Sequence, residues 1–246
     1  MVAFVTEAVG TAIRALSTDD CKEQEAWGGA MGFKFNGLEM EAEERREAFT
    51  NWLLAKGFQD LARGIRETLE EAYFYLRVFG LGSFKASTGE FNALLERFRL
   101  DAAKPNFPAL LGQVNAGLQQ PLAFETEFLS LQKVRNCLEH RGGLVGSKDV
   151  DPITGTLILS FPRLEMYYVI GGEEVEVVPG QEIIADADGH PFRQEEVQIY
   201  IRRVTRSREY AFGQPIEITL TDFLEIALGC QMFTDDLATK LPTRPE

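Results

Sequence analysis

The sequence contains few cysteines and histidines and no long hydrophobic run. Its three cysteines, Cys21, Cys137 and Cys230, are far apart and lack C-x-x-C spacing, so neither a disulfide framework nor a zinc site is expected. Two histidines are too few for a histidine-rich metal site. No apolar run approaches the ~20 residues of a membrane-spanning helix, and the first residues lack the basic flank and apolar centre of a secretory signal. We therefore expect a cytoplasmic protein with no membrane association, no metal and no cofactor.

Common catalytic motifs and an excess of positive charge are also missing. The sequence has no G-x-S-x-G elbow, no Walker loop, no H-E-x-x-H pair and no G-x-G-x-x-G after a strand. A D-x-D-G sequence begins at Asp186, but it lacks the later glutamate of a calcium loop, so we interpret it as a turn. The formal net charge of −13 at pH 7 argues against a protein that binds nucleic acid by phosphate neutralisation alone.

RNA binding would therefore require a local basic patch, and the segment 201–208 is a candidate because it contains four arginines. Strand alternation places Arg202, Arg206 and Arg208 on one face. The alternative is that this face pairs with the acidic segment 173–176, since opposite charges on neighbouring strands are mildly favourable.

The 246 residues, 45% hydrophobic and 26% charged, have the composition of a globular protein. Hydrophobic spacing predicts an α+β fold, a mainly helical bundle with an antiparallel β-rich insertion and a C-terminal helix. We assign residues 1–145 and 220–241 to the bundle, 154–219 to the insertion and 242–246 to a loose tail. The predicted helices cover residues 2–17, 41–79, 90–103, 107–118 and 122–141, followed by a final helix capped by Thr221. The predicted strands cover residues 157–161, 164–170, 173–178, 183–185, 197–206 and 216–220, and a loop is predicted at 27–37.

The predicted helix at 122–141 carries the strongest sign of a functional site. It has an apolar stripe of Phe124, Phe128, Leu131 and Leu138. Arg135 falls within that stripe, where a guanidinium is costly unless it meets an anion or hydrogen-bond acceptors. Five residues later, His140 supplies an imidazole, whose unperturbed pKa suits proton transfer near neutral pH. A surface histidine at a helix end is the alternative, and spacing alone does not exclude it.

The segment 134–143, VRNCLEHRGG, resembles the R-x(4–6)-H signature of the HEPN family, here an R-x4-H motif formed by Arg135, Asn136 and His140. As in the common form of the signature, a polar residue follows the arginine and glycine comes after the histidine. The resemblance covers residues 1–145 and 220–241 and leaves the β-rich insertion before the last helix unexplained. It implies a homodimer in which two motif helices meet and, in many members, metal-independent endoribonuclease activity.

The chemistry of RNA cleavage without a metal fits these residue types. One group must remove the 2′-hydroxyl proton, one must stabilise charge at phosphorus, and one must protonate the leaving 5′-oxygen. His140 is the predicted acid or base, Arg135 the predicted phosphate and transition-state ligand, and Asn136 the group that orients the histidine or a phosphate oxygen. Residues five apart on one helix point about 140° away from each other. We therefore expect a two-fold dimer to bring Arg135 of one chain toward His140 of the other.

RNA is thus the predicted substrate, and an antitoxin or other regulatory protein is a candidate partner. The predicted substrate-binding residues are Arg141, Arg202, Arg206 and Arg208. The alternative function is a catalytically inactive HEPN-like module for dimerisation, nucleotide binding or partner binding. A third possibility is a structural α+β protein with a chance motif. The surface around Arg135 separates these readings: convergence of Arg141, Arg202 and Lys148 favours RNA, and dominance of Glu139 and other acids disfavours it.

Overall fold

The computed structural model describes residues 1–17, 26–28, 31–33, 40–83, 85–177 and 198–243. The helices are α1 (Val2–Ala15), α2 (Ala42–Phe79), α3 (Thr88–Ala103), α4 (Phe107–Gly117), α5 (Glu125–Arg141) and α6 (Leu220–Lys240). The strands are β1 (Ala26–Gly28), β2 (Met31–Phe33), β3 (Thr156–Ile170), β4 (Glu173–Glu176) and β5 (Tyr200–Ala211). The predicted α+β, mainly helical architecture is confirmed. The predicted loop at 27–37 is wrong in part, because strands as short as β1 and β2 show no alternating pattern in the sequence.

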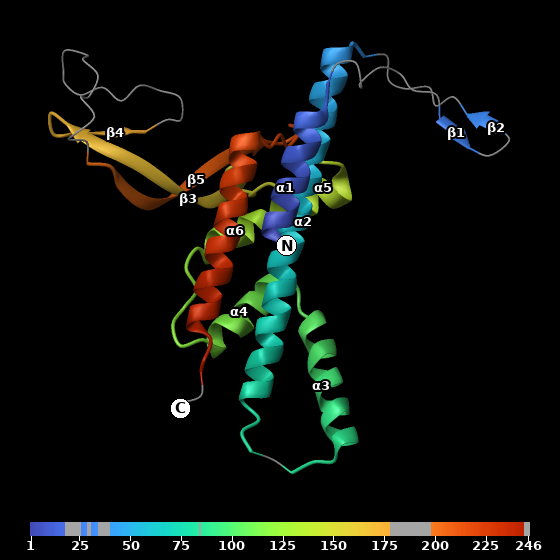
Figure 1. Ribbon diagram of the computed structural model, residues 1–246, viewed down its shortest axis with the longest axis vertical. Coiled ribbons are helices and arrows are strands. Elements are labelled where there is room, and N and C mark those ends of the chain that lie inside the picture. Colours follow the sequence, from blue (N-terminus) through green and yellow to red (C-terminus); the bar gives the residue numbers. More distant parts are fainter. Residues whose placement is uncertain (18–25, 29–30, 34–39, 84, 178–197, 244–246) are drawn as a thin grey trace.

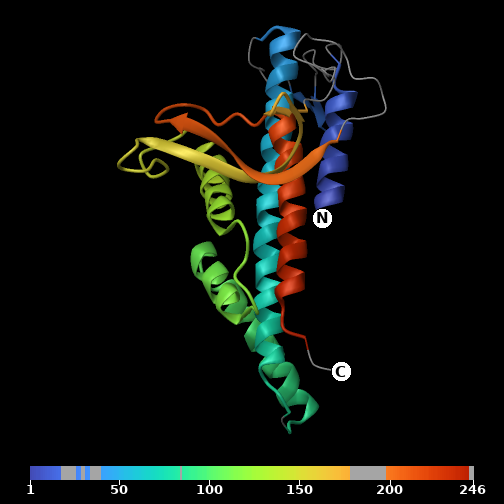
Figure 2. The same ribbon diagram turned by 90° about the vertical axis from the view of Figure 1, so that its left-hand side faces the viewer.

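Helix α2 forms the long axis of the molecule (Figure 1). Its 38 residues form one unbroken helix, about 57 Å long at 1.5 Å per residue. Helix α6 lies alongside α2, and α1 packs on the first half of α2, whereas α3 folds back along its far end (Figures 1 and 2). Helices α4 and α5 also pack against α2. None of the helices in the described part of the chain is both long enough and apolar enough to cross a membrane.

Helix ends follow the capping signals in the sequence, with one correction. Ser87 and Glu90 form the capping box that begins α3. The final helix is capped by Thr219 rather than by the predicted Thr221, because the Thr219 hydroxyl accepts the Asp222 amide at 3.1 Å. The predicted strand at 216–220 is also wrong. Its alternation arises because Ile216 and Ile218 both enter the core from an extended segment that leads into α6.

The larger sheet has the antiparallel order β4-β3-β5. Strand β3 turns into β4 at Gly171-Gly172, where φ values of 58° and 88° meet the requirement of a tight two-residue hairpin. The two strands predicted at 157–161 and 164–170 are in fact one strand that continues through Pro162. Proline is tolerated there because β4 pairs only with Tyr167–Ile170, which leaves β3 with a partner on one side at Pro162. The predicted strand at 183–185 and the turn at Asp186 lie outside the described residues.

The sheet shares one hydrophobic core with the helices. Leu157, Leu159 and Phe161 of β3 are at most 1% exposed and join the cluster formed by the helices. One face of the sheet bonds to α6 through Arg208 and Asp222, and the other bonds to α5 through Thr205 and Glu127. The described part of the predicted insertion at 154–219 therefore positions α5 and α6 relative to each other.

A close helix crossing at Gly57 gives the first testable prediction. A Cβ atom at Gly57 would lie 2.7 Å from Val9 Cγ2 of α1 and 2.8 Å from Phe223 Cε2 of α6. Both contacts are too short, and Phe223 is fully buried. We expect Gly57→Ala to lower the free energy of unfolding by about 1–2 kcal/mol, because overpacking outweighs the gain in helix propensity. Denaturant unfolding followed by circular dichroism measures this change.

Gly112 provides the matched control in α4. A Cβ atom there has no neighbour within 4 Å, and the residue is exposed. Gly112→Ala should raise the free energy of unfolding by up to about 1 kcal/mol through helix propensity alone. Equal effects of the two substitutions would contradict the close crossing at Gly57.

Candidate functional site

The motif residues lie on the last two turns of α5. This helix is fixed by buried apolar side chains and by hydrogen bonds to β3. Its buried residues are Phe128, Leu131, Val134 and Cys137. The Ser130 hydroxyl donates to the Ser160 carbonyl at 2.9 Å and accepts the Ser160 amide at 2.8 Å, which joins α5 to β3. The helix ends at Gly142, whose φ of 63° is the left-handed conformation typical of a helix C-terminus.

Arg135 lies at the edge of the buried stripe and has local partners. Its side chain is 23% exposed and forms an ion pair with Glu139, one helical turn later. It also donates a 3.2 Å hydrogen bond to the side-chain oxygen of Asn136. The acceptors that the sequence required for this guanidinium are therefore supplied by the same helix.

His140 is exposed and lies close to the same carboxylate. Its side chain is 61% exposed, and its Nε2 lies 4.0 Å from Oε2 of Glu139, the oxygen that pairs with Arg135. The Arg135 side chain points toward the C-terminal end of α5, so Arg135 and His140 of one chain both lie near Oε2 of Glu139. This differs from the expectation that one helix would direct them apart. The arrangement can hold a phosphate oxygen next to a proton-transfer group if Glu139 moves away.

Asn136 contacts the arginine rather than the histidine. Its Oδ1 accepts hydrogen bonds from Arg135 Nη1 at 3.2 Å and from Gln132 Nε2 at 3.1 Å. Because arginine can only donate, this network identifies which atom of the Asn136 amide is the oxygen. Asn136 therefore orients Arg135.

Arg141 is engaged in a structural pair behind the motif. It binds Asp149 through two hydrogen bonds, one of them 2.7 Å from Nε to Oδ2. Burial opposes ionisation of Asp149, but hydrogen bonds from Arg141 and from the Gly146 amide outweigh it and lower the pKa of Asp149. This pair joins the end of α5 to the following loop, a role that no sequence pattern indicated.

The other predicted substrate-binding arginines lie on the face of the sheet that contacts α6, and each is paired with carboxylates. Arg202 donates to Glu165 at 2.5 Å and to Glu174 at 2.6 Å, so one of the three arginines contacts the acidic segment, across the intervening strand β3. Arg208 binds Asp222 through two hydrogen bonds of 2.9 Å and 2.8 Å. Arg206 lies 3.2 Å from Glu225, whose pKa is raised by burial.

These arginines do not converge on the motif. Thr205 of β5 bonds to Glu127 in the first turn of α5, far from His140, and Arg202 lies three residues earlier on the other face of the sheet. Of the four, only Arg141 belongs to the motif helix, and Glu139 is the charged residue paired with Arg135. The role of these four arginines in substrate binding stays a prediction, and their ion pairs weigh against it.

A groove of about 750 Å³ opens beside the motif, between α5, the loop before β3, and β3 itself. Its lining includes Lys133 and Asn136 of α5, Asp151 and Ile153 of the loop, and Ile158 of β3. Sequence reasoning missed this groove because its walls come from segments that show no shared pattern.

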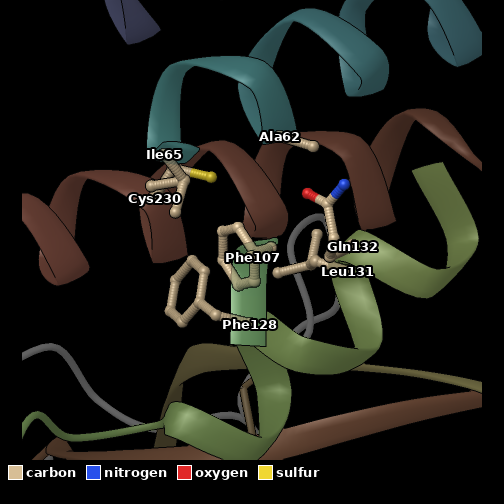
Figure 3. A pocket seen from close by; sticks show the side chains of 7 residues that line it. All are labelled: Ala62, Ile65, Phe107, Phe128, Leu131, Gln132 and Cys230. Atoms are coloured by element: carbon tan, nitrogen blue, oxygen red, sulfur yellow. The ribbon is translucent and has the colours of Figure 1, made fainter. Parts of the chain in front are cut away.

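A second space between α2, α4, α5 and α6 belongs to the core (Figure 3). Its lining is almost wholly apolar and includes Phe107, Phe128 and Cys230, with Gln132 at one end. The space is too narrow for a water molecule, so it reflects side-chain packing rather than a ligand site. Burial raises the pKa of Cys230 to about 12, which makes this thiol unreactive.

Within the described ranges, histidine, cysteine and acidic side chains form no group of three or more able to hold a metal ion. No family model, no curated protein and no solved structure matches the chain. The geometry around Arg135 and His140 therefore carries the functional argument.

Proposed function

We propose that the chain is a metal-independent endoribonuclease of the HEPN type whose site is formed by Arg135 and His140. The observation that supports this proposal is the approach of both side chains to a single anionic oxygen at the exposed end of α5. A phosphate oxygen in place of that carboxylate oxygen would have a guanidinium and an imidazole beside it. They can fill two of the three roles in metal-independent cleavage of RNA, stabilisation of charge at phosphorus and transfer of one proton.

In the proposed reaction, the ribose 2′-oxygen attacks phosphorus and the 5′-oxygen leaves. His140 accepts the 2′-hydroxyl proton or donates a proton to the leaving oxygen, and a second chain of a homodimer can supply the other histidine. Arg135, oriented by Asn136, stabilises the charge that develops on the phosphate oxygens. The products are a 2′,3′-cyclic phosphate and a 5′-hydroxyl.

The test is cleavage of a diverse pool of labelled single-stranded RNA by the purified chain in EDTA. We expect cleavage whose products carry 2′,3′-cyclic phosphate ends, identified by their mobility before and after phosphatase treatment. Complete absence of cleavage over the whole pool would overturn the catalytic proposal.

Glu139 should act as an internal competitor of the substrate phosphate. The Arg135–Glu139 pair is partly exposed, and such pairs contribute about 0.2–1 kcal/mol. We therefore expect Glu139→Gln to lower the KM for RNA about two- to fivefold, because the phosphate no longer displaces an anion. Steady-state cleavage kinetics at constant ionic strength measure this effect.

Glu125→Gln is the matched control for Glu139→Gln. Glu125 lies in the first turn of the same helix, and its substitution removes the same charge at the end away from the motif. Equal KM values for the two variants would show that any change comes from net charge and would contradict the competitor role.

A catalytically inactive module for dimerisation, nucleotide binding or partner binding is the second candidate. It is favoured by the carboxylate partners of the five arginines predicted to act on RNA, which are Arg135, Arg141, Arg202, Arg206 and Arg208. This function predicts a homodimer in analytical ultracentrifugation together with no cleavage. Capture of an antitoxin or other regulatory protein would then identify its partner.

A further inference from the structure

The groove beside the motif has the size and composition of a small-molecule site. Its volume of about 750 Å³ falls within the ~300–1,000 Å³ of typical ligand pockets. Ile153, which is 93% exposed, and Ile158, which is 38% exposed, supply apolar surface on two sides. Exposed isoleucine side chains offer a surface for a flat apolar ring.

Asn136 connects this groove to Arg135. Its Oδ1 is occupied by Arg135 and Gln132, whereas its Nδ2 bonds no described residue. Asn136 lines the groove, and its amide nitrogen carries two N–H donors. Asn136 therefore contacts Arg135, the proposed phosphate ligand, and also lines the groove in which the rest of a nucleotide could bind.

Lys133 lies one helical turn before Asn136 and supplies positive charge on the same wall. Across the groove, the Asp151 carboxylate accepts the amides of Ile153 and Thr154 at 2.8 Å and 3.1 Å. These bonds lower the pKa of Asp151 and occupy one of its oxygens, Oδ1. The groove therefore combines donors on α5 with one carboxylate oxygen that can accept a hydroxyl.

We infer that the groove binds the nucleoside of one ribonucleotide whose phosphate lies between Arg135 and His140. The base lies against Ile153 and Ile158, Asn136 donates to an acceptor on the base, and the free oxygen of Asp151 accepts a ribose hydroxyl. This inference rests on the proposed function, because it assigns the phosphate to the motif residues. It adds a subsite for the sugar and base of the substrate.

The experiment measures equilibrium binding to the full chain by isothermal titration calorimetry. The probes are inorganic phosphate and the four nucleoside 3′-monophosphates. We expect at least one nucleotide to bind about tenfold tighter than phosphate. Ile158→Trp, which fills the groove from β3, should reduce nucleotide affinity to that of phosphate and leave phosphate binding unchanged.

The control is Ile201→Trp, the same substitution at a 64% exposed position on β5 outside the groove lining, and it should change neither affinity. The inference is overturned if no nucleotide binds tighter than phosphate, or if Ile158→Trp and Ile201→Trp give the same nucleotide affinity. Phosphate binding that is lost in Arg135→Ala, with no added nucleotide affinity, removes the subsite but retains the proposed function. Failure of the wild type to bind any of these probes overturns the subsite, and the cleavage assay in EDTA then decides the proposed function separately.

Discussion

Replacing His140 by alanine should reduce RNA cleavage by about 10²–10⁴-fold, the usual contribution of a general acid or base. The loss should appear in kcat, because the imidazole moves a proton in the transition state and contributes little to binding of the RNA. His140 is 61% exposed, so its removal should leave the fold and the thermal unfolding midpoint unchanged. Single-turnover cleavage and circular dichroism measured on the same preparation test both expectations.

His190→Ala is the control, since it makes the same substitution at the other histidine of the chain. It should leave the cleavage rate unchanged. Cleavage by His140→Ala at the wild-type rate would remove His140 from the mechanism, whatever the behaviour of Arg135→Ala.

A mixture of Arg135→Ala and His140→Ala chains separates two arrangements of the proposed dimer. If Arg135 of one chain acts with His140 of the other, the mixed dimer regains one intact site. If both residues act within one chain, no intact site forms. We expect no recovery, because both side chains already approach the same Glu139 oxygen within one chain.

Replacing Asp222 by alanine should have the largest effect on stability. Asp222 is 1% exposed, accepts two hydrogen bonds from Arg208 and lies 3.7 Å from Arg206. Its removal leaves the Arg208 guanidinium without its carboxylate partner, whereas Arg206 keeps Glu225 at 3.2 Å. Loss of one partner of a fully buried pair costs about 3–5 kcal/mol, and we expect about 2–4 kcal/mol here because the Arg208 side chain remains 43% exposed.

Glu174→Ala provides the comparison on the same sheet. The Glu174 side chain is 49% exposed and pairs with Arg202, which is 43% exposed, so its removal should cost less than about 1 kcal/mol. Denaturant unfolding of both variants tests the difference. Similar losses would mean that burial does not strengthen the Asp222 pair.

The helices could be predicted closely because their signals are local. The capping box at Ser87, the uninterrupted apolar spacing of α2 and the two glycines after Arg141 each act within a few residues. The strand predicted at 216–220 was wrong because the same local alternation fits two structures. Ile216 and Ile218 alternate as in a strand, yet they belong to an extended segment that enters the core before Thr219 caps α6.

The candidate residues were chosen from the sequence, whereas their contacts are known only from the structure. The sequence identified Arg135, Asn136 and His140 from residue type and spacing, and it named Glu139 as the acid that would oppose RNA binding. The ion pair with Glu139 and the bond from Arg135 to Asn136 depend on side-chain conformations that spacing does not determine. The groove beside Asn136 depends on segments more than ten residues apart in the chain.

By itself, the sequence determined the α+β class, the helix carrying the motif and the hairpin at Gly171-Gly172, because propensity, capping and hydrophobic period are short-range properties. Only the tertiary structure decided which arginines of the basic segment are paired with carboxylates. The pairing of β3 with β5 and the packing of the sheet on α6 bring Arg206 and Arg208 to Asp222 and Glu225. Opposite charges attract more strongly where one of them is buried, as Asp222 is, so two arginines of the basic segment are paired with carboxylates of α6 in the fold.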